Sequence, residues 1–248
     1  MPVGKFLQNR VMGPLSAAES DRLAASIDSL IEIPARQTMV REGAPLDKSS
    51  LLLSGMMTRC IDDRSGYRQV VAVHVPGDFV DLHAYPLKRL DHDVVTLTAV
   101  RMAIFPHTAL DSIVEERPTL TRKLWASTLI DAAVHRQWVF RQGRLDAVGR
   151  IAHFLCEMNA RFLAIDMSTG LSFRLPMTQA DIGEACGLTQ VHVNRVLREL
   201  RDNGICTARS GVVTIINPRM LASIGQFDPA YLYLADHVVA RLNAINAG

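Results

Sequence analysis

The sequence lacks the features that mark secreted, membrane-spanning and fibrous proteins. Its 248 residues include four cysteines, and these do not have the C-x-x-C spacing of a zinc knuckle or a redox pair. No apolar run approaches the roughly 20 residues that a membrane span requires. The first six residues are not a basic stretch that leads into an apolar one, so we expect no secretory leader. We therefore predict a cytoplasmic protein with no membrane partner, and we assign it no metal site.

A large excess of charge of one sign is also missing. The chain has 27 basic and 25 acidic residues, a net charge of +2, and no lysine follows Lys123. Arginine suits phosphates and guanine edges, but it forms surface ion pairs equally well. Charge alone therefore neither identifies nor excludes a nucleic-acid partner. The hydrophobic fraction of 48% is ordinary for a globular protein and sufficient for a buried core.

The first part of the chain has the pattern of a β-rich domain. Ser16 and Glu19 form a capping box that opens a short helix with Leu23 and Leu30 on its apolar face. From about Gln37 to Phe105, short apolar runs alternate with glycines. Short, β-branched runs separated by turn residues favour strands of a β-sandwich or roll.

A long helix is predicted next, from Thr119 to about Leu145, where Gly143 is the one glycine and proline is absent. Its apolar residues form two stripes. One holds Trp125 and Leu129, and the other holds Ile130, Val134 and Trp138. A helix with two apolar faces needs two partners, so we predict a homodimer with Ile130, Val134 and Trp138 in its interface. The alternative is a helix buried inside one larger domain.

The most informative segment runs from Thr178 to Leu197 and has the pattern of a helix-turn-helix. Thr178 and Thr189 are placed to cap the two helices, and Gly187 between them tolerates the positive φ of a sharp turn. The inward positions are small and apolar, and Gly183 allows close approach of the helices. The residues predicted to contact DNA are Thr178, Thr189, Gln190, His192, Asn194, Arg195 and Arg198.

A β-hairpin is expected after this motif. Two short apolar runs, 204–207 and 212–215, flank the segment from Ala208 to Gly211, which is typical of a tight turn. The hairpin makes the motif a winged one. Its predicted function is sequence-specific binding of double-stranded DNA through the major groove.

Taken together, the motifs resemble the Crp/Fnr family of bacterial transcription regulators, named for the cyclic-AMP receptor protein and its fumarate-nitrate relative. The resemblance covers about residues 15–217 and includes turns at 40–43 and 76–79 and a hinge segment at 146–152. It implies an α+β fold with a β-roll sensor domain (1–118), a dimerisation helix (119–145) and a winged helix-turn-helix domain with a C-terminal extension (146–248). It also implies a transcription regulator rather than an enzyme, with RNA polymerase as a partner.

The effector pocket of that family is altered here. The family's cyclic-nucleotide cassette carries a Gly-Glu pair for the ribose and an Arg-Ser pair for the phosphate, and Asp81-Leu82 and Leu90-Asp91 stand at those places. A carboxylate would repel a cyclic phosphate, so cyclic AMP is not expected. The resemblance assigns the effector pocket to Asp81, His83, Leu90 and Asp91. The iron–sulfur branch of the family carries a cysteine cluster near its N-terminus, and the first cysteine here is Cys60.

Two other ligand chemistries stay open for the β-domain. His83 and Pro2 match the places of the haem ligands in the family's carbon-monoxide sensor, which makes haem an alternative effector. A cupin-like metalloenzyme would instead draw ligands from four histidines, although no H-x-H pair is present. These are His74, His83, His92 and His107.

The C-terminal tail lies outside the resemblance. Asp228 and Pro229 can start a helix, and an apolar stripe follows at Leu232, Ala235, Val239 and Leu242. We expect this helix to pack on its own DNA-binding domain.

Overall fold

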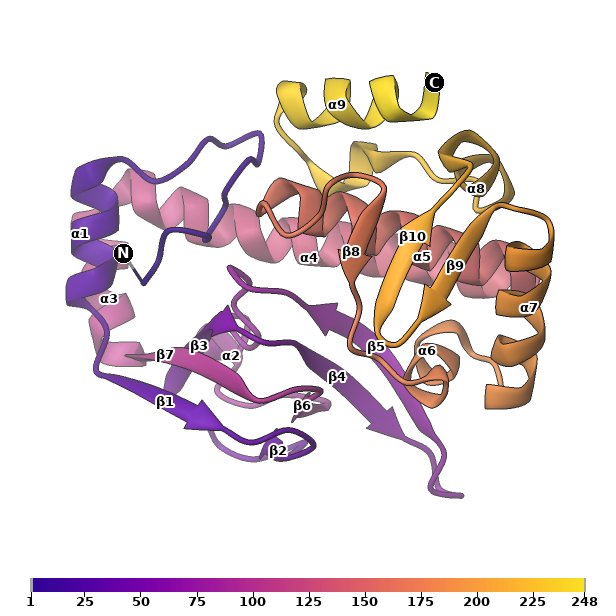
Figure 1. The fold of residues 1–248 in the computed structure, drawn as a ribbon. Helices are drawn as coiled ribbons and strands as arrows, with labels where there is room; N and C mark the ends of the chain where they lie inside the picture. Colours follow the sequence, from indigo (N-terminus) through magenta and orange to yellow (C-terminus); the bar gives the residue numbers. More distant parts are fainter. Residues whose placement is uncertain (1, 248) are drawn as a thin grey trace. The chain divides into compact units, whose positions relative to one another are not determined.

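The computed structural model describes residues 2–247 and is of the α+β class (Figure 1). The chain forms two compact units. The first contains most of the chain through Ala132, and the second contains the chain from Ala133 onward together with residues 9–11 and 68–70. Each unit is described by itself.

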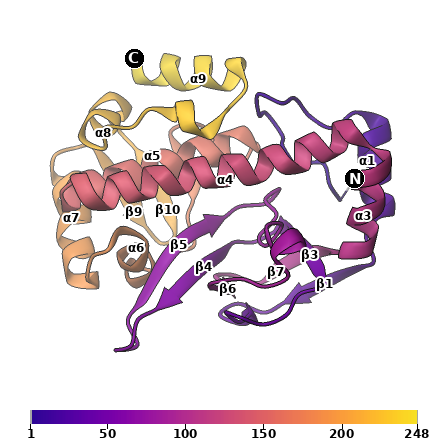
Figure 2. The same cartoon turned by 180° about the vertical axis from the view of Figure 1, so that it is seen from behind.

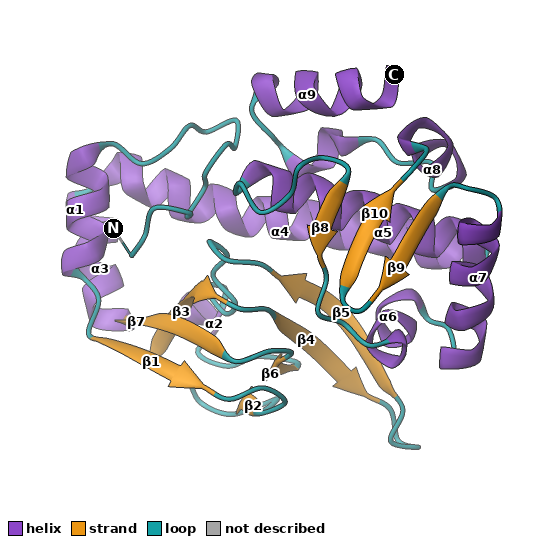
Figure 3. Cartoon of the chain, viewed as in Figure 1, coloured by secondary structure: helices purple, strands orange, loops and turns teal. Residues whose placement is uncertain are grey.

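The first unit is built on two small sheets (Figure 3). One has the strand order β1-β7-β3, and the other has the order β2-β6-β4-β5. The strands are β1 (Ser29–Ile33), β2 (Thr38–Val40), β3 (Lys48–Ser54), β4 (Met57–Asp62), β5 (Arg68–His74), β6 (Asp93–Thr96) and β7 (Val100–Pro106). The short apolar runs at 51–53, 70–73 and 102–105 lie in β3, β5 and β7, and the run at 94–97 lies in β6 as far as Thr96. The prediction of a β-rich domain is confirmed.

In the sheet of β1, β7 and β3, strands β3 and β7 are buried on both faces, whereas β1 has exposed residues on one face. Successive side chains of a strand point to opposite faces, and Leu51 and Leu52 of β3 accordingly enter two different apolar clusters. Ala103 and Phe105 of β7 join the cluster of Leu51, whereas Met102 and Ile104 join the other. This double burial explains why these strands have continuous apolar runs rather than an alternating pattern.

Four helices accompany the sheets. They are α1 (Ala17–Ala25), α2 (Ala84–Leu87), α3 (His107–Glu116) and α4 (Pro118–Arg144). The capping box of α1 forms as predicted, with Ser16 and Glu19 bonded reciprocally. Leu30, however, lies in β1 instead of on the helix. The helix ends early because the backbone N–H of Asp28 bonds to the carbonyl of Ile104, which begins the pairing of β1 with β7.

The second unit surrounds helix α5 (Ala147–Ala164), which is buried along almost its whole length. The remaining elements are β8 (Ser172–Arg174), α6 (Gln179–Cys186), α7 (Gln190–Asp202), β9 (Cys206–Arg209), β10 (Val212–Ile215), α8 (Pro218–Ile224), the 3-10 turn η1 (Pro229–Leu232) and α9 (Asp236–Ala247). The strands form a sheet of order β8-β10-β9. β8 is a strand that sequence reasoning missed.

The C-terminal tail packs on α5, but not as one helix. Asp228 caps the turn η1, and Tyr233 then adopts a left-handed conformation that stops the turn. The chain resumes as α9, whose buried residues are Val238 and Leu242. These residues join Leu232 and residues of α5 in one apolar cluster, so the tail is part of the second unit's core. Among the described residues, no helix has the length and apolarity needed to span a bilayer.

Candidate nucleic-acid interface and sensor-domain cluster

Helices α6 and α7 form the predicted helix-turn-helix. The Thr178 hydroxyl accepts a bond from the Asp181 backbone N–H at 3.1 Å, and the Asp181 carboxylate accepts from the Thr178 backbone N–H at 2.7 Å. Thr189 caps α7 by accepting from the His192 N–H at 3.3 Å. Both helices therefore start where the capping residues predict.

The turn between the helices depends on two glycines. Gly187 ends α6 with a φ of +63°, the left-handed region that favours glycine. A Cβ at Gly183 would lie 2.5 Å from the carbonyl oxygen of Leu188, closer than side-chain carbons approach backbone oxygens. Gly183 thus allows the chain after α6 to pass directly against that helix.

Helix α7 has one buried and one exposed face. Val193, Val196, Leu197 and Leu200 are buried. The other face is exposed and polar, and it carries Gln190, His192, Asn194, Arg195 and Arg198. The sequence-predicted residues of α7 are therefore brought together on one face, with Thr189 at its N-terminus. Thr178 lies at the start of α6, where its hydroxyl serves the cap.

The wing is the hairpin of β9 and β10. Arg209 pairs with Val212, and the two residues between them, Ser210 and Gly211, both have positive φ. A two-residue loop of this kind matches the twist of the flanking strands. The first strand begins at Cys206 rather than at Gly204, because Gly204 adopts a left-handed turn after α7.

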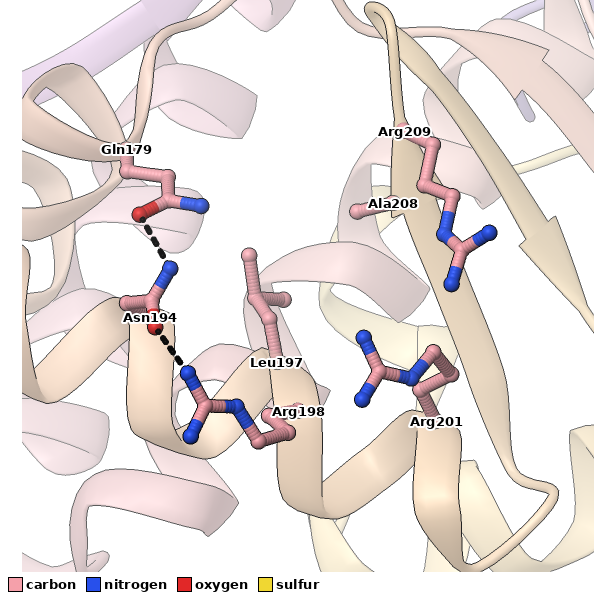
Figure 4. Close-up of a pocket in the computed structure, with 7 residues that line it drawn as sticks. All are labelled: Gln179, Asn194, Leu197, Arg198, Arg201, Ala208 and Arg209. Carbon is pink, nitrogen blue, oxygen red and sulfur yellow. Dashed lines mark hydrogen bonds between the residues drawn. The ribbon is translucent and has the colours of Figure 1, made fainter.

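A polar hollow of about 230 Å³ lies between α7 and the wing (Figure 4). On one side Asn194 donates to Gln179 and accepts from Arg198, both at 3.2 Å. Arg201 of α7 and Arg209 of β9 line the opposite side. Three guanidinium groups around one hollow suit a phosphate oxygen. Gln179, Arg201 and Arg209 were not singled out from the sequence, because only the packing of the wing beside α7 brings them together.

A buried polar network supports α6 from inside the second unit. Arg141 is fully buried, donates to the carbonyl of Ala185 at 2.7 Å, and stacks 4.2 Å from the Trp138 ring. Trp138 and Tyr231 both donate to the buried carboxylate of Glu157. The C-terminal tail, which supplies Tyr231, is therefore tied to the same network as the end of α6.

The four residues assigned to an effector pocket have different environments in the first unit. Leu90 is in the apolar core. Asp81 is also buried, and its carboxylate accepts from the Ser50 backbone N–H at 2.6 Å, while burial raises its pKa to about 7. His83 and Asp91 do lie together, and His92 joins them. We call His83, Asp91 and His92 the histidine–aspartate cluster.

Arg59 borders this cluster, and each of its three guanidinium nitrogens has a partner in the protein. Its Nε donates to the carbonyl of Val80 at 2.9 Å, Nη1 pairs with Asp131, and Nη2 lies 3.5 Å from Nδ1 of His83. Burial lowers the pKa of His83 to about 3, and the charge of Arg59 contributes to this. The ring of His83 is therefore neutral at physiological pH.

The structure does not bring together the residues proposed for a four-histidine metal site or for haem. His107 contacts Ser49 and Lys88 instead of joining His83 and His92, so the four histidines do not form one set. Pro2 lines a separate hollow with Gly77 and Leu52, whose lining does not include His83.

Helix α4 is continuous from end to end (Figure 2). The apolar stripe of Ile130, Val134 and Trp138 packs against other parts of the same chain. Ile130 is 9% exposed in the core of the first unit. Val134 packs against the apolar cluster of α5 and the tail, and Trp138 bonds to Glu157. The exposed apolar residues of α4 are instead Trp125, Leu129, Val139 and Phe140.

Two family profiles match the chain. Residues 30–117 match the cyclic nucleotide-binding domain, and residues 149–224 match the Crp-like helix-turn-helix domain. The first region contains the strands of the first unit from β1 onward, and the second contains α6, α7 and the wing.

Curated relatives align along most of the chain. The transcriptional activator protein anr of Pseudomonas aeruginosa is 27% identical over 218 residues, which is 85% of this chain and 87% of the relative. The anaerobic regulatory protein of Haemophilus influenzae is 24% identical over 201 residues, or 81% of this chain and 78% of the relative. These relatives are transcription regulators, which argues against the metalloenzyme hypothesis.

Solved structures share the fold. FixK2 from Bradyrhizobium japonicum has a TM-score of 0.72 at 23% identity and covers 79% of this chain and 96% of its own. The regulator CLP of Xanthomonas campestris, described as responsive to c-di-GMP, has a TM-score of 0.64 at 18% identity and covers 81% of this chain and 99% of its own.

Proposed function

Because the chain belongs to the Crp/Fnr family of transcription regulators, we propose that it binds a two-fold symmetric DNA site as a homodimer, with α7 of each subunit in the major groove. The observation that carries this proposal is the exposed polar face of α7, which is bordered by the arginines of the hollow beside the wing. In this geometry the two half-site centres lie about 34 Å apart. The family resemblance also implies that the DNA-bound protein contacts RNA polymerase at a promoter.

Arg195 is the residue we assign to base recognition. It is exposed near the start of α7, and among the described residues its guanidinium forms no hydrogen bond or ion pair. A free arginine fork matches O6 and N7 of guanine together. Arg198 is already bonded to Asn194, so it is better suited to hold that side chain in place.

The residues around the hollow have a different role. Arg209 on the wing is also exposed, and its guanidinium has no hydrogen bond or ion pair within the described chain, but it belongs to the strand rather than to the helix that enters the groove. We assign Arg209 to DNA phosphates, and with it Arg201, whose guanidinium is also paired with Asp202 at 2.6 Å. Phosphate contacts position the protein and carry no direct sequence information.

Binding-site selection with the wild type, Arg195→Ala and Arg209→Ala tests these assignments. Loss of a bidentate base contact should cost about 1–3 kcal/mol and relax the preference at one base pair of each half-site. Loss of a phosphate contact should weaken binding to all sequences alike and reduce the salt slope by about one. If Arg195→Ala recovers the same motif as the wild type, Arg195 does not read a base.

The homodimer interface is assigned to the exposed face of α4. Trp125, Leu129, Ala132, Arg136 and Val139 follow one another at spacings of four and three residues and are all exposed. This spacing is that of a coiled-coil seam. The apolar side chains of this seam are free for a second copy, whereas those of Ile130 and Trp138 are already packed within the protomer.

Cyclic AMP is not the effector in this proposal. The place of the family's phosphate-binding pair is held by Leu90, which is buried in the core, and by Asp91, which is anionic. The nearby Arg59 is engaged by Val80 and Asp131. Calorimetry should detect no binding of cyclic AMP at micromolar concentrations. Binding at that level with a matching gain in DNA affinity would contradict the assignment.

A further inference from the structure

The histidine–aspartate cluster in the first unit has the composition of a metal site. One donor atom from each of His83, Asp91 and His92 lies within 4.8 Å of the other two. His83 precedes α2, and the other two residues precede β6, so the short segment between His83 and Asp91 brings the three side chains together. The imidazole centroids of His83 and His92 are 5.3 Å apart.

His92 is poorly satisfied without a ligand. The residue is 6% exposed, its Nδ1 lies 2.8 Å from a carboxylate oxygen of Asp91, and its Nε2 is buried with no hydrogen-bond partner in the described chain. A buried polar atom that lacks a partner costs free energy.

The charges around the cluster favour a cation. Arg59 is paired with Asp131, and the Asp91 carboxylate lies against His92. Taken as one cation and two carboxylates, these three groups sum to one negative charge. A net negative charge makes an anion a poorer fit than a cation.

We propose that His83, Asp91 and His92 bind a divalent first-row transition-metal ion of the zinc or cobalt type. Two imidazoles and one carboxylate suit such ions, whereas magnesium and calcium prefer oxygen ligands alone. Metal–ligand bonds of about 2.0–2.2 Å place the donors roughly 3–4 Å apart, so donors that lie up to 4.8 Å apart here need to move closer by up to about 2 Å. The Asp91 side chain has room for this movement, because 92% of it is exposed. The site concerns the first unit alone and does not depend on DNA binding.

Calorimetric titration of zinc into the tag-free, metal-stripped full chain tests the proposal, and cobalt absorption reports the coordination. Asp91→Asn and His83→Gln remove ligands, and His107→Gln is the matched control, because His107 is a histidine of the same unit that contacts Ser49 instead. We expect one zinc ion per chain, affinity at least about tenfold weaker in both ligand variants, and wild-type affinity in the control. A tenfold excess of magnesium should not displace the zinc.

The proposal is overturned if zinc does not bind, or if both ligand variants retain wild-type affinity. It is also overturned if His107→Gln loses as much affinity as the ligand variants. Misfolding does not obscure the result, because the exposed Asp91 side chain can be replaced without disturbing the core, and circular dichroism verifies the fold. DNA binding is measured on the same samples. A failure of the metal-site proposal can then be told apart from a failure of the DNA-binding proposal, because the two measurements are independent.

Discussion

Asp81 is a buried carboxyl group that contributes to the fold of the first unit. Its carboxylate accepts from the backbone N–H of Ser50, which lies in β3 and is buried. Burial raises the pKa of Asp81 to about 7, although the bond to Ser50 opposes the shift. The protonation of this group is therefore linked to the stability of the first unit.

The sign of that linkage follows from the two pKa values. In the unfolded chain Asp81 ionises near its ordinary pKa of 3.8, and in the folded chain near 7. Between these pH values the folded state holds the additional proton, so stability falls as the pH rises and levels off above about 7. Since one pKa unit corresponds to about 1.4 kcal/mol, the total effect is of the order of a few kcal/mol.

Asp81→Asn should remove this pH dependence. The amide oxygen can still accept from Ser50, but it carries no charge at any pH. We expect the variant to gain stability relative to the wild type at pH 8 and to gain much less at pH 5. Urea unfolding at the two pH values measures the difference. An equal slope of stability against pH in both proteins would show that Asp81 is not the group responsible.

At the scale of elements, the angle between α6 and α7 rests on the contact at Gly183. Glycine in a helix costs about 0.5–1 kcal/mol relative to alanine, so helix propensity alone favours replacing it. The packing opposes the change, because a Cβ would meet the backbone oxygen of Leu188 at 2.5 Å. Backbone cannot give way as the end of a flexible side chain can.

Gly183→Ala should therefore destabilise the second unit despite its better propensity. Overpacking of this kind costs about 1–3 kcal/mol, and displacement of α7 should also weaken DNA binding. Thermal unfolding and a DNA titration measure the two effects. Ala180→Ser, at an exposed position of the same helix, is the control and should stay within about 0.5 kcal/mol of the wild type. A Gly183→Ala protein as stable as this control would show that the close approach is not required.

At the scale of the whole molecule, the exposed apolar face of α4 is the feature that a single subunit leaves unexplained. Trp125 is 65% exposed, Leu129 54% and Val139 64%. Contiguous exposed apolar side chains of this size mark an interaction site more often than a free surface. A two-fold dimer would also double the DNA contacts, which is the arrangement that a symmetric site requires.

Leu129→Glu combined with Val139→Glu should convert the dimer to a monomer and lower the affinity for a two-half-site DNA. Four like charges would then face each other across the seam. Sedimentation velocity gives the mass, and a gel shift gives the DNA affinity. His135→Glu is the matched control, because His135 is exposed on α4 but lies off the seam. A double variant that keeps the dimer mass would exclude this face.

Local chemistry was sufficient to predict the β-rich first part, the long helix and the helix-turn-helix, whereas the α+β fold as a whole was what the family resemblance implied. Caps, turn glycines and apolar periodicity act within a few residues, so Ser16, Thr178 and Gly187 have the roles in the structure that their neighbours indicate. The exposed face of α7 follows from the same periodicity, because a helix places every third or fourth residue on one side. Strands without alternation, such as β3, could be placed approximately but not assigned to a sheet.

Tertiary structure alone decided which residues meet across long separations and which apolar stripe is occupied. Ile130 and Trp125 are both apolar residues of one helix, and only packing against the rest of the chain buries the first and exposes the second. Packing likewise decides that Arg209 lies beside α7, and the fold of the short segment 83–92 decides that His92 lies beside His83. Sequence periodicity specifies which side chains share a face of a helix or strand. Whether that face is buried depends on which other parts of the chain pack against it.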